Sequence, residues 1–83
     1  MRVLYFAWVR EAVGVDGELV APPPEITTVA DLIDWLSGRS EGHARAFADR
    51  SRLRAAVDQA FVPLDASVTG ANEVAIFPPV TGG

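Results

Sequence analysis

The hydrophobic pattern of this chain predicts two strong strands, one near each end. Residues 2–9 form a nearly unbroken apolar run, which is typical of a central strand buried on both faces. The run Glu73–Phe77 is apolar and partly β-branched, and Pro78-Pro79 stops it because proline cannot donate to a strand ladder. Residues 18–20 predict a short strand antiparallel to the first, at an edge of the sheet because prolines follow it.

The main helix is predicted over Val29–Ser37. Its apolar positions recur at the helical period and form one stripe, which consists of Val29, Leu32, Ile33 and Leu36. Thr28 and Asp31 have the spacing of a capping box at its start, and Gly38 suits the C-terminal cap position. We expect this helix to lie across one face of the sheet.

Weaker patterns predict two further helical segments. Residues 10–13 indicate one helical turn, which Gly14 is placed to end. Residues 41–50 indicate a second helix, in which a few apolar side chains recur. Its inward-facing positions would be Ala44, Phe47 and Ala48.

A hairpin is predicted between the second helix and the last strand. Residues 53–57 and Ala60–Val62 are two apolar runs on either side of Asp58-Gln59. The predicted order is therefore strand, strand, helix, short helix, hairpin, strand. This order predicts an α+β fold. A mixed sheet with the first and last strands central and parallel, and with one main helix across one face, is an arrangement that this order and the right-handed crossover rule permit, and we expect it here.

The end of the chain has no pattern that could bury it. After Pro78-Pro79 come Val80, Thr81, Gly82 and Gly83, and two glycines are costly to order and contribute no packing. One interpretation is a frayed terminus. The other interpretation is that the tail enters a narrow channel in another protein, because glycines lack Cβ atoms and could pass through a channel that larger residues would block. The six residues after Phe77 reach about 20 Å when extended, and the prolines bias them towards that form.

Composition limits the remaining classes of function. A chain of 83 residues makes one domain, residues 1–83, from which the flexible tail of residues 78–83 extends. The net charge of −4 argues against nucleic-acid binding, and no apolar run approaches the length of a membrane span. Met1-Arg2 leads into a strand without a signal-peptide cleavage pattern, so we expect a soluble cytoplasmic protein. All seven basic residues are arginines and there is no cysteine, so no amine or thiol side chain could attack an activated terminus.

No side-chain constellation indicates catalysis or metal binding. His43 is the only histidine, and we expect it at a solvated surface. The acidic residues are scattered without the spacing of metal ligands, so no metal site is predicted. A triad of Ser51, His43 and Asp49 can be written down, but nothing in the sequence places these residues together.

The tail carries a family resemblance. Residues 74–83, Val-Ala-Ile-Phe-Pro-Pro-Val-Thr-Gly-Gly, resemble the C-terminal signature of the small subunit of molybdopterin synthase, a family of ubiquitin-like β-grasp sulfur carriers. The resemblance extends to residues 3–7, 9–14 and 55–59 and so spans most of the chain. Two departures lie in predicted turns: Asp58 stands where asparagine is more usual, and Gly70-Ala71-Asn72 replaces a more usual Asp-Gly-Asp.

The resemblance implies a chemistry centred on the tail. A partner enzyme would adenylate Gly83 with ATP, and a sulfur donor would then convert the adenylate to a thiocarboxylate. The tail would enter the large synthase subunit, in a heterotetramer of two plus two chains, and pass the sulfur to cyclic pyranopterin monophosphate. Gly82 would give clearance in the channel. The stem would consist of Pro78, Pro79, Val80 and Thr81. The carrier itself would bind no cofactor and supply few or no catalytic side chains.

Two questions stay open at this level. Strand alternation places Ala75 and Phe77 on one face, so Phe77 is either a hydrophobic anchor for the partner or a core residue. The function also has alternatives. One is a sulfur carrier for thiamin or another cofactor, although thiamin carriers are usually shorter and lack the Pro-Pro-Val-Thr stem. The other is a ubiquitin-like modifier or interaction module.

Overall fold

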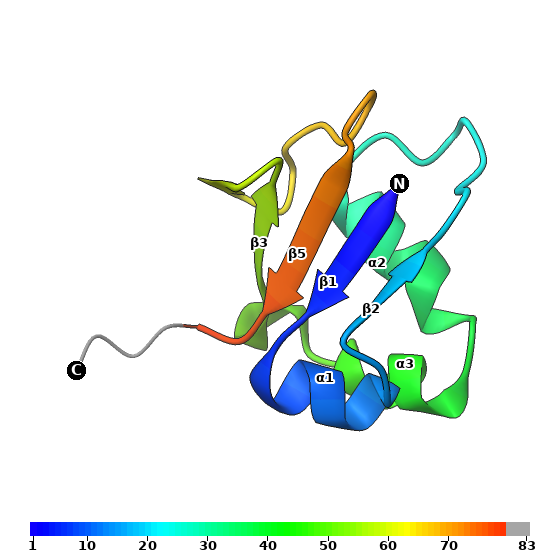
Figure 1. Cartoon of the computed structure of the whole chain (residues 1–83), viewed down its shortest axis with the longest axis vertical. Coiled ribbons are helices and arrows are strands. Elements are labelled where there is room, and N and C mark those ends of the chain that lie inside the picture. The colour runs from blue at the N-terminus through cyan, green and yellow to red at the C-terminus, as the bar shows by residue number, and fades with distance from the viewer. Residues whose placement is uncertain (80–83) are drawn as a thin grey trace.

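The computed structural model describes residues 1–79, which form a mixed sheet of five strands with helices packed against it (Figure 1). The strands are β1 (Arg2–Tyr5), β2 (Gly17–Leu19), β3 (Arg54–Val57), β4 (Ala60–Val62) and β5 (Glu73–Phe77). Their order is β2-β1-β5-β3-β4, with β1 and β5 parallel and the other neighbours antiparallel. The predicted α+β arrangement, with the first and last strands central and parallel, is confirmed.

The N-terminal apolar run is split between a strand and a helix. β1 ends at Tyr5, and α1 (Ala7–Val13) begins two residues later, so the prediction of one strand over residues 2–9 is wrong. The chain turns at Ala7, whose φ of 54° lies in the left-handed region of backbone conformation, which residues other than glycine rarely adopt. Val9 is fully buried from α1, which explains the error, because a buried helix and a buried strand both read as an apolar run.

The capping predictions are confirmed at α1 and at α2 (Val29–Ser37). Gly14 ends α1 with a φ of 97°, and its N–H donates to the Arg10 carbonyl at 2.8 Å. At the start of α2 the Asp31 N–H donates to the Thr28 hydroxyl at 3.1 Å, and the Thr28 N–H donates to the Asp31 carboxylate at 3.2 Å. The predicted apolar stripe of α2 is completely buried. The sequence of α2 and its flanking residues therefore specifies where the helix begins and ends and which of its faces is buried.

The second predicted helix is shorter than expected and presents a different face. α3 (Glu41–Ala46) ends early and is followed by a 3₁₀ turn, η1 (Arg50–Arg52). Phe47 is buried as predicted, but Ala44 and Ala48 are exposed. The buried residues of α3 are His43 and Ala46, which precede Phe47 at helical spacing. The prediction failed because it counted the histidine as polar and continued the helix past Ala46.

Gly42 sets the distance between α3 and α1. A Cβ atom at this position would lie 2.4 Å from the Ala12 carbonyl oxygen, which is closer than real Cβ contacts. Glycine therefore allows the two helices to approach closely at this position.

The predicted hairpin forms, although β3 begins one residue later than expected. Asp58 and Gln59 have φ values of 47° and 72°, the left-handed pair that a two-residue turn requires, here without glycine. The Asp58 carboxylate also accepts hydrogen bonds from the N–H groups of Asn72 and Glu73, both at 3.0 Å. Aspartate in this turn thereby connects the hairpin to the start of β5.

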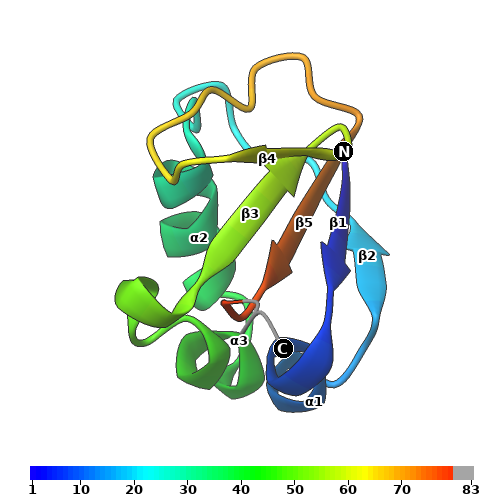
Figure 2. The ribbon, with the colours of Figure 1, turned by 90° about the vertical axis from the view of Figure 1, so that its left-hand side faces the viewer.

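The core lies between the sheet and α2, while α1 and α3 lie at the end where β1 and β5 finish (Figure 2). Its largest fully buried side chains include Tyr5, Phe47, Leu32, Ile33, Leu36, Leu53 and Ile76. Within residues 1–79, no helix covers the opposite face of the sheet (Figures 1 and 2). Among residues 1–79, no helix is long and apolar enough to cross a membrane.

Candidate functional site

The tail begins on the uncovered face of the sheet. Val74 and Ile76 of β5 are fully buried in the core, so the alternation of the strand places Ala75 and Phe77 on the opposite face. Phe77 is half-buried and is not part of the buried core, so the interpretation of Phe77 as a core residue is wrong. Pro78 and Pro79 follow directly, and both lie against the same face as Phe77.

Val80, Thr81, Gly82 and Gly83 lie outside the described residues. Their assigned roles as stem, clearance and sulfur-bearing residues therefore remain predictions.

A groove of about 620 Å³ lies where the tail starts. The strand registers place Leu4, Ala75, Ala56 and Phe61 in one row across β1, β5, β3 and β4. The two alanines are the small side chains in the middle of this row, so they form a low floor between larger apolar walls. We call this feature the tail groove, and its walls are Leu4, Phe6, Phe61 and Phe77.

The aromatic walls of the tail groove are unusually open to solvent. Phe61 is 82% exposed and Phe6 is 47% exposed. The rings of Phe61 and Phe77 contact each other with centroids 5.7 Å apart and planes inclined by 48°. Exposed apolar side chains that gather on one face mark an interaction site more often than isolated ones do.

Phe6, Leu4 and Phe61 were not identified from the sequence. Phe6 was assigned to a buried strand and Phe61 to an ordinary hairpin strand. The alternation of side chains along each strand could have shown which residues of one strand share a face. Only the pairing register shows that Leu4 and Phe61 lie on the same face as Phe77.

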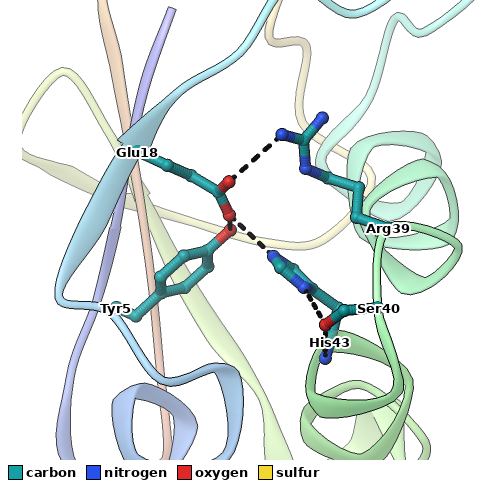
Figure 3. A network of polar contacts seen from close by, with 5 residues as sticks. All are labelled: Tyr5, Glu18, Arg39, Ser40 and His43. Carbon is teal, nitrogen blue, oxygen red and sulfur yellow. Dashed lines mark hydrogen bonds and ion pairs between the residues drawn. The ribbon is translucent and has the colours of Figure 1, made fainter.

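A second cluster of polar side chains lies on the opposite side of the sheet, between β2, β1 and α3 (Figure 3). The Tyr5 hydroxyl donates to the Glu18 carboxylate at 2.6 Å, and His43 Nε2 lies 2.7 Å from the same oxygen. Arg39 pairs with the other carboxylate oxygen at 3.3 Å. Ser40 Oγ lies 2.7 Å from His43 Nδ1, so both ring nitrogens of His43 have partners. The expectation of a solvated His43 is wrong, because this side chain is only 7% exposed.

The pKa shifts in this polar cluster favour an ionised Glu18 and a neutral Tyr5. Burial acts to raise the pKa of Glu18, but the hydrogen bonds from His43 and Tyr5 and the charge of Arg39 outweigh it and hold the pKa below its ordinary value. Burial, followed by the hydrogen bond to Glu18, raises the pKa of Tyr5 far above its ordinary value. Glu18 is therefore an anion and Tyr5 a neutral donor at physiological pH.

The possible triad is not assembled. The Asp49 carboxylate accepts hydrogen bonds from the Ser51 N–H and hydroxyl at 3.1 and 2.6 Å, whereas the His43 ring is bound by Ser40 and Glu18. Within residues 1–79, no group of three His, Cys, Asp or Glu side chains could hold a metal ion. The described part of the chain thus presents an exposed apolar face where the tail begins.

Sequence comparisons place this chain among known proteins. A family model described as the ThiS family matches residues 3–83. The molybdopterin synthase sulfur carrier subunit of Escherichia coli is 45% identical, with 100% of this chain and 99% of that protein covered. The subunit of the same name from Haemophilus influenzae is 34% identical with the same coverage.

Solved structures share the fold. SAMP1 from Haloferax volcanii aligns with a TM-score of 0.72 and 26% identity, covering 100% of this chain and 98% of that chain. The putative molybdopterin converting factor, subunit 1, from Pyrococcus furiosus has the same TM-score and 31% identity, with 95% of each chain covered. These likenesses confirm the β-grasp prediction. Because the family model spans residues 3–83 and the curated relatives align end to end, the chain belongs to the ThiS family.

Proposed function

We propose that this protein is the sulfur carrier subunit of a molybdopterin synthase. The observation that carries the proposal is the apolar tail groove at the end of β5, where Pro78-Pro79 begin the segment whose sequence ends in Gly82-Gly83. The 45% identity to a curated molybdopterin synthase sulfur carrier subunit, over the full length of both chains, supports the same assignment.

The chemistry takes place at the carboxyl group of Gly83. This group is ionised at neutral pH and is a poor electrophile, so a partner enzyme must activate it. A carboxylate oxygen attacks the α-phosphate of ATP, pyrophosphate leaves, and an acyl adenylate forms. A sulfur donor then displaces AMP and leaves a thiocarboxylate. The carrier binds no cofactor of its own, and ATP is bound by the activating partner.

Delivery of the sulfur depends on the tail groove. We infer that Phe61 and Phe77 pack against the large synthase subunit and direct the tail into it. Pro78 and Pro79 reduce the entropy lost when the stem becomes ordered, and Val80 and Thr81 extend that stem. Gly82 gives clearance, and Gly83 brings the sulfur to cyclic pyranopterin monophosphate.

Water restores the Gly83 carboxylate after the sulfur has been transferred. We assign the carrier to a heterotetramer of two small and two large subunits that works in the cytoplasm.

Intact-mass spectrometry tests this proposal. The protein is incubated with its adenylating partner, ATP and a sulfur source, and its mass should rise by the difference between one sulfur and one oxygen atom. Fragmentation should locate the change at Gly83. Addition of the large subunit and the pterin precursor should return the mass to its starting value. A variant that lacks Gly83 serves as the control and should remain unmodified.

Other outcomes of this experiment would favour the alternative functions. A thiocarboxylate that is discharged by a thiazole-forming system, and not by the large subunit, would indicate the thiamin pathway. A ladder of conjugates to other proteins would indicate a protein modifier.

A further inference from the structure

Arg54 stands beside the tail groove on the uncovered face of the sheet. It is the register partner of Phe77 in the antiparallel pairing of β3 with β5. Directly opposed residues of antiparallel strands project on the same face, so the arginine side chain neighbours the phenylalanine ring. Together with Phe61 and Phe77 it lines a hollow of about 240 Å³ next to the tail groove.

The guanidinium group of Arg54 is held in place by the backbone. Its Nη1 donates to the Leu53 carbonyl at 2.8 Å and to the Ser51 carbonyl at 3.3 Å. An arginine has five N–H donors in a planar fork, so these two bonds leave donors free for another group. A side chain that is already ordered loses less entropy when a partner binds it.

The charge of Arg54 has no acidic partner within residues 1–79. Arg39 pairs with Glu18 and Arg50 pairs with Asp34, whereas no carboxylate of the described residues forms an ion pair with Arg54. A protein that covers Phe61 and Phe77 would also cover this guanidinium group. Burial of a charge without a counter-charge is costly, so such a partner must supply one.

We propose that Arg54 binds a carboxylate on the protein that receives the tail, an Asp or Glu side chain next to the apolar patch that contacts Phe61 and Phe77. This inference rests on the proposed function, since it adds a specific polar contact to the same docking face. The planar guanidinium group suits a two-point contact with a carboxylate, which fixes orientation as well as position. Arg54 thereby fixes the orientation of the carrier on the partner protein while the tail enters that protein.

The absence of lysine from this chain allows a direct test by cross-linking. Arg54→Lys introduces the only ε-amine of the protein, and a carbodiimide joins an amine to a carboxylate without a spacer. In complex with the large subunit, this variant should form an intermolecular amide that peptide mass spectrometry locates at one Asp or Glu. Arg45→Lys is the matched control, because Arg45 is an exposed arginine of α3 that forms no ion pair within residues 1–79. It should give at least 10-fold less of the cross-linked product.

Affinity measurements separate this inference from the proposed function. By isothermal titration, Arg54→Met should weaken binding to the large subunit about 10- to 100-fold, while Arg45→Met changes it less than twofold. Both variants should remain folded under the conditions of the titration, which urea unfolding checks. If the parent binds and Phe61→Ser weakens binding, but Arg54→Met matches Arg45→Met, the inference about Arg54 is wrong and the docking face stands. If the parent protein itself neither binds the large subunit nor donates sulfur, the proposed function fails as well.

Discussion

Removal of the Tyr5 hydroxyl tests how much the buried polar cluster around Glu18 contributes to the stability of the fold. In Tyr5→Phe the ring keeps its contacts with the rings of His43 and Phe47, whose centroids lie 6.0 and 6.1 Å away. Only the 2.6 Å hydrogen bond to the Glu18 carboxylate is lost. Hydrogen bonds to charged groups contribute about 1.5–3 kcal/mol. The Glu18 side chain is 19% exposed and keeps His43 and Arg39, so we expect the lower end, about 1.5 kcal/mol.

The pH dependence of this loss follows from the ionisation of Glu18. Its pKa in the folded protein is lowered, since hydrogen bonds and charges outweigh the opposing effect of burial. Such a group contributes stability above its unfolded-state pKa of about 4.3, and this contribution is lost as the pH falls through the folded-state pKa. Tyr5→Phe removes one cause of the lowered pKa. The difference between the two proteins should therefore be largest near pH 7 and should shrink below about pH 4.

Urea unfolding followed by far-ultraviolet circular dichroism and tryptophan fluorescence measures both effects. With a denaturant slope of about 1 kcal/mol per molar urea for a chain this small, a loss of 1.5 kcal/mol lowers the midpoint by roughly 1.5 M. A double-mutant cycle with Glu18→Gln isolates the pairwise contribution from general effects of each change. Equal midpoints of Tyr5→Phe and the parent at pH 7, or a difference that grows in acid, would refute the argument.

Three further predictions concern packing, the tail and docking. Gly42→Ala should destabilise the fold by about 1–3 kcal/mol in the same urea assay, because the new Cβ meets the Ala12 carbonyl oxygen at 2.4 Å. Gly38→Ala is its control and should cost less than about 0.5 kcal/mol, because its nearest neighbour lies at 3.6 Å. Gly82→Val should abolish molybdopterin formation with unchanged unfolding, and normal synthesis by this variant would contradict the narrow channel. Phe77→Ala should weaken binding to the large subunit by about 2 kcal/mol and cost less stability than the roughly 3–5 kcal/mol of a core phenylalanine; the opposite pattern would rule out the anchor.

The sequence by itself determined the elements whose signals are local. α2 was predicted with its bounds, its capping box and its buried stripe, because all three depend on residues within one or two turns of each other. The Asp58-Gln59 hairpin and the end of β5 before the prolines were readable for the same reason. The parallel pairing of the first and last strands was expected from two strong apolar runs together with the family resemblance, and the register of β1 with β5 confirms it.

Only the tertiary structure decided which distant residues meet. The apolar run at the N-terminus is compatible with a strand or a helix. In the folded chain the turn at Ala7 divides this run into β1 and α1. His43 looked like a surface residue until Glu18 and Ser40, which lie on different elements, provided partners for both ring nitrogens. Sequence spacing carries no information about such contacts, since they arise when strands and helices pack.

The proposed docking face also divides between sequence and structure. The two glycines and two prolines of the tail led to the prediction, from the sequence alone, that this end of the chain carries the function. The groove from which this tail starts exists because three strand registers bring Leu4, Ala75, Ala56 and Phe61 into one row. Arg54 belongs to this face for the same reason, since its neighbour Phe77 is 23 positions away in the chain. A shift of any register by one residue would turn these side chains into the core, so the face is a property of the assembled sheet.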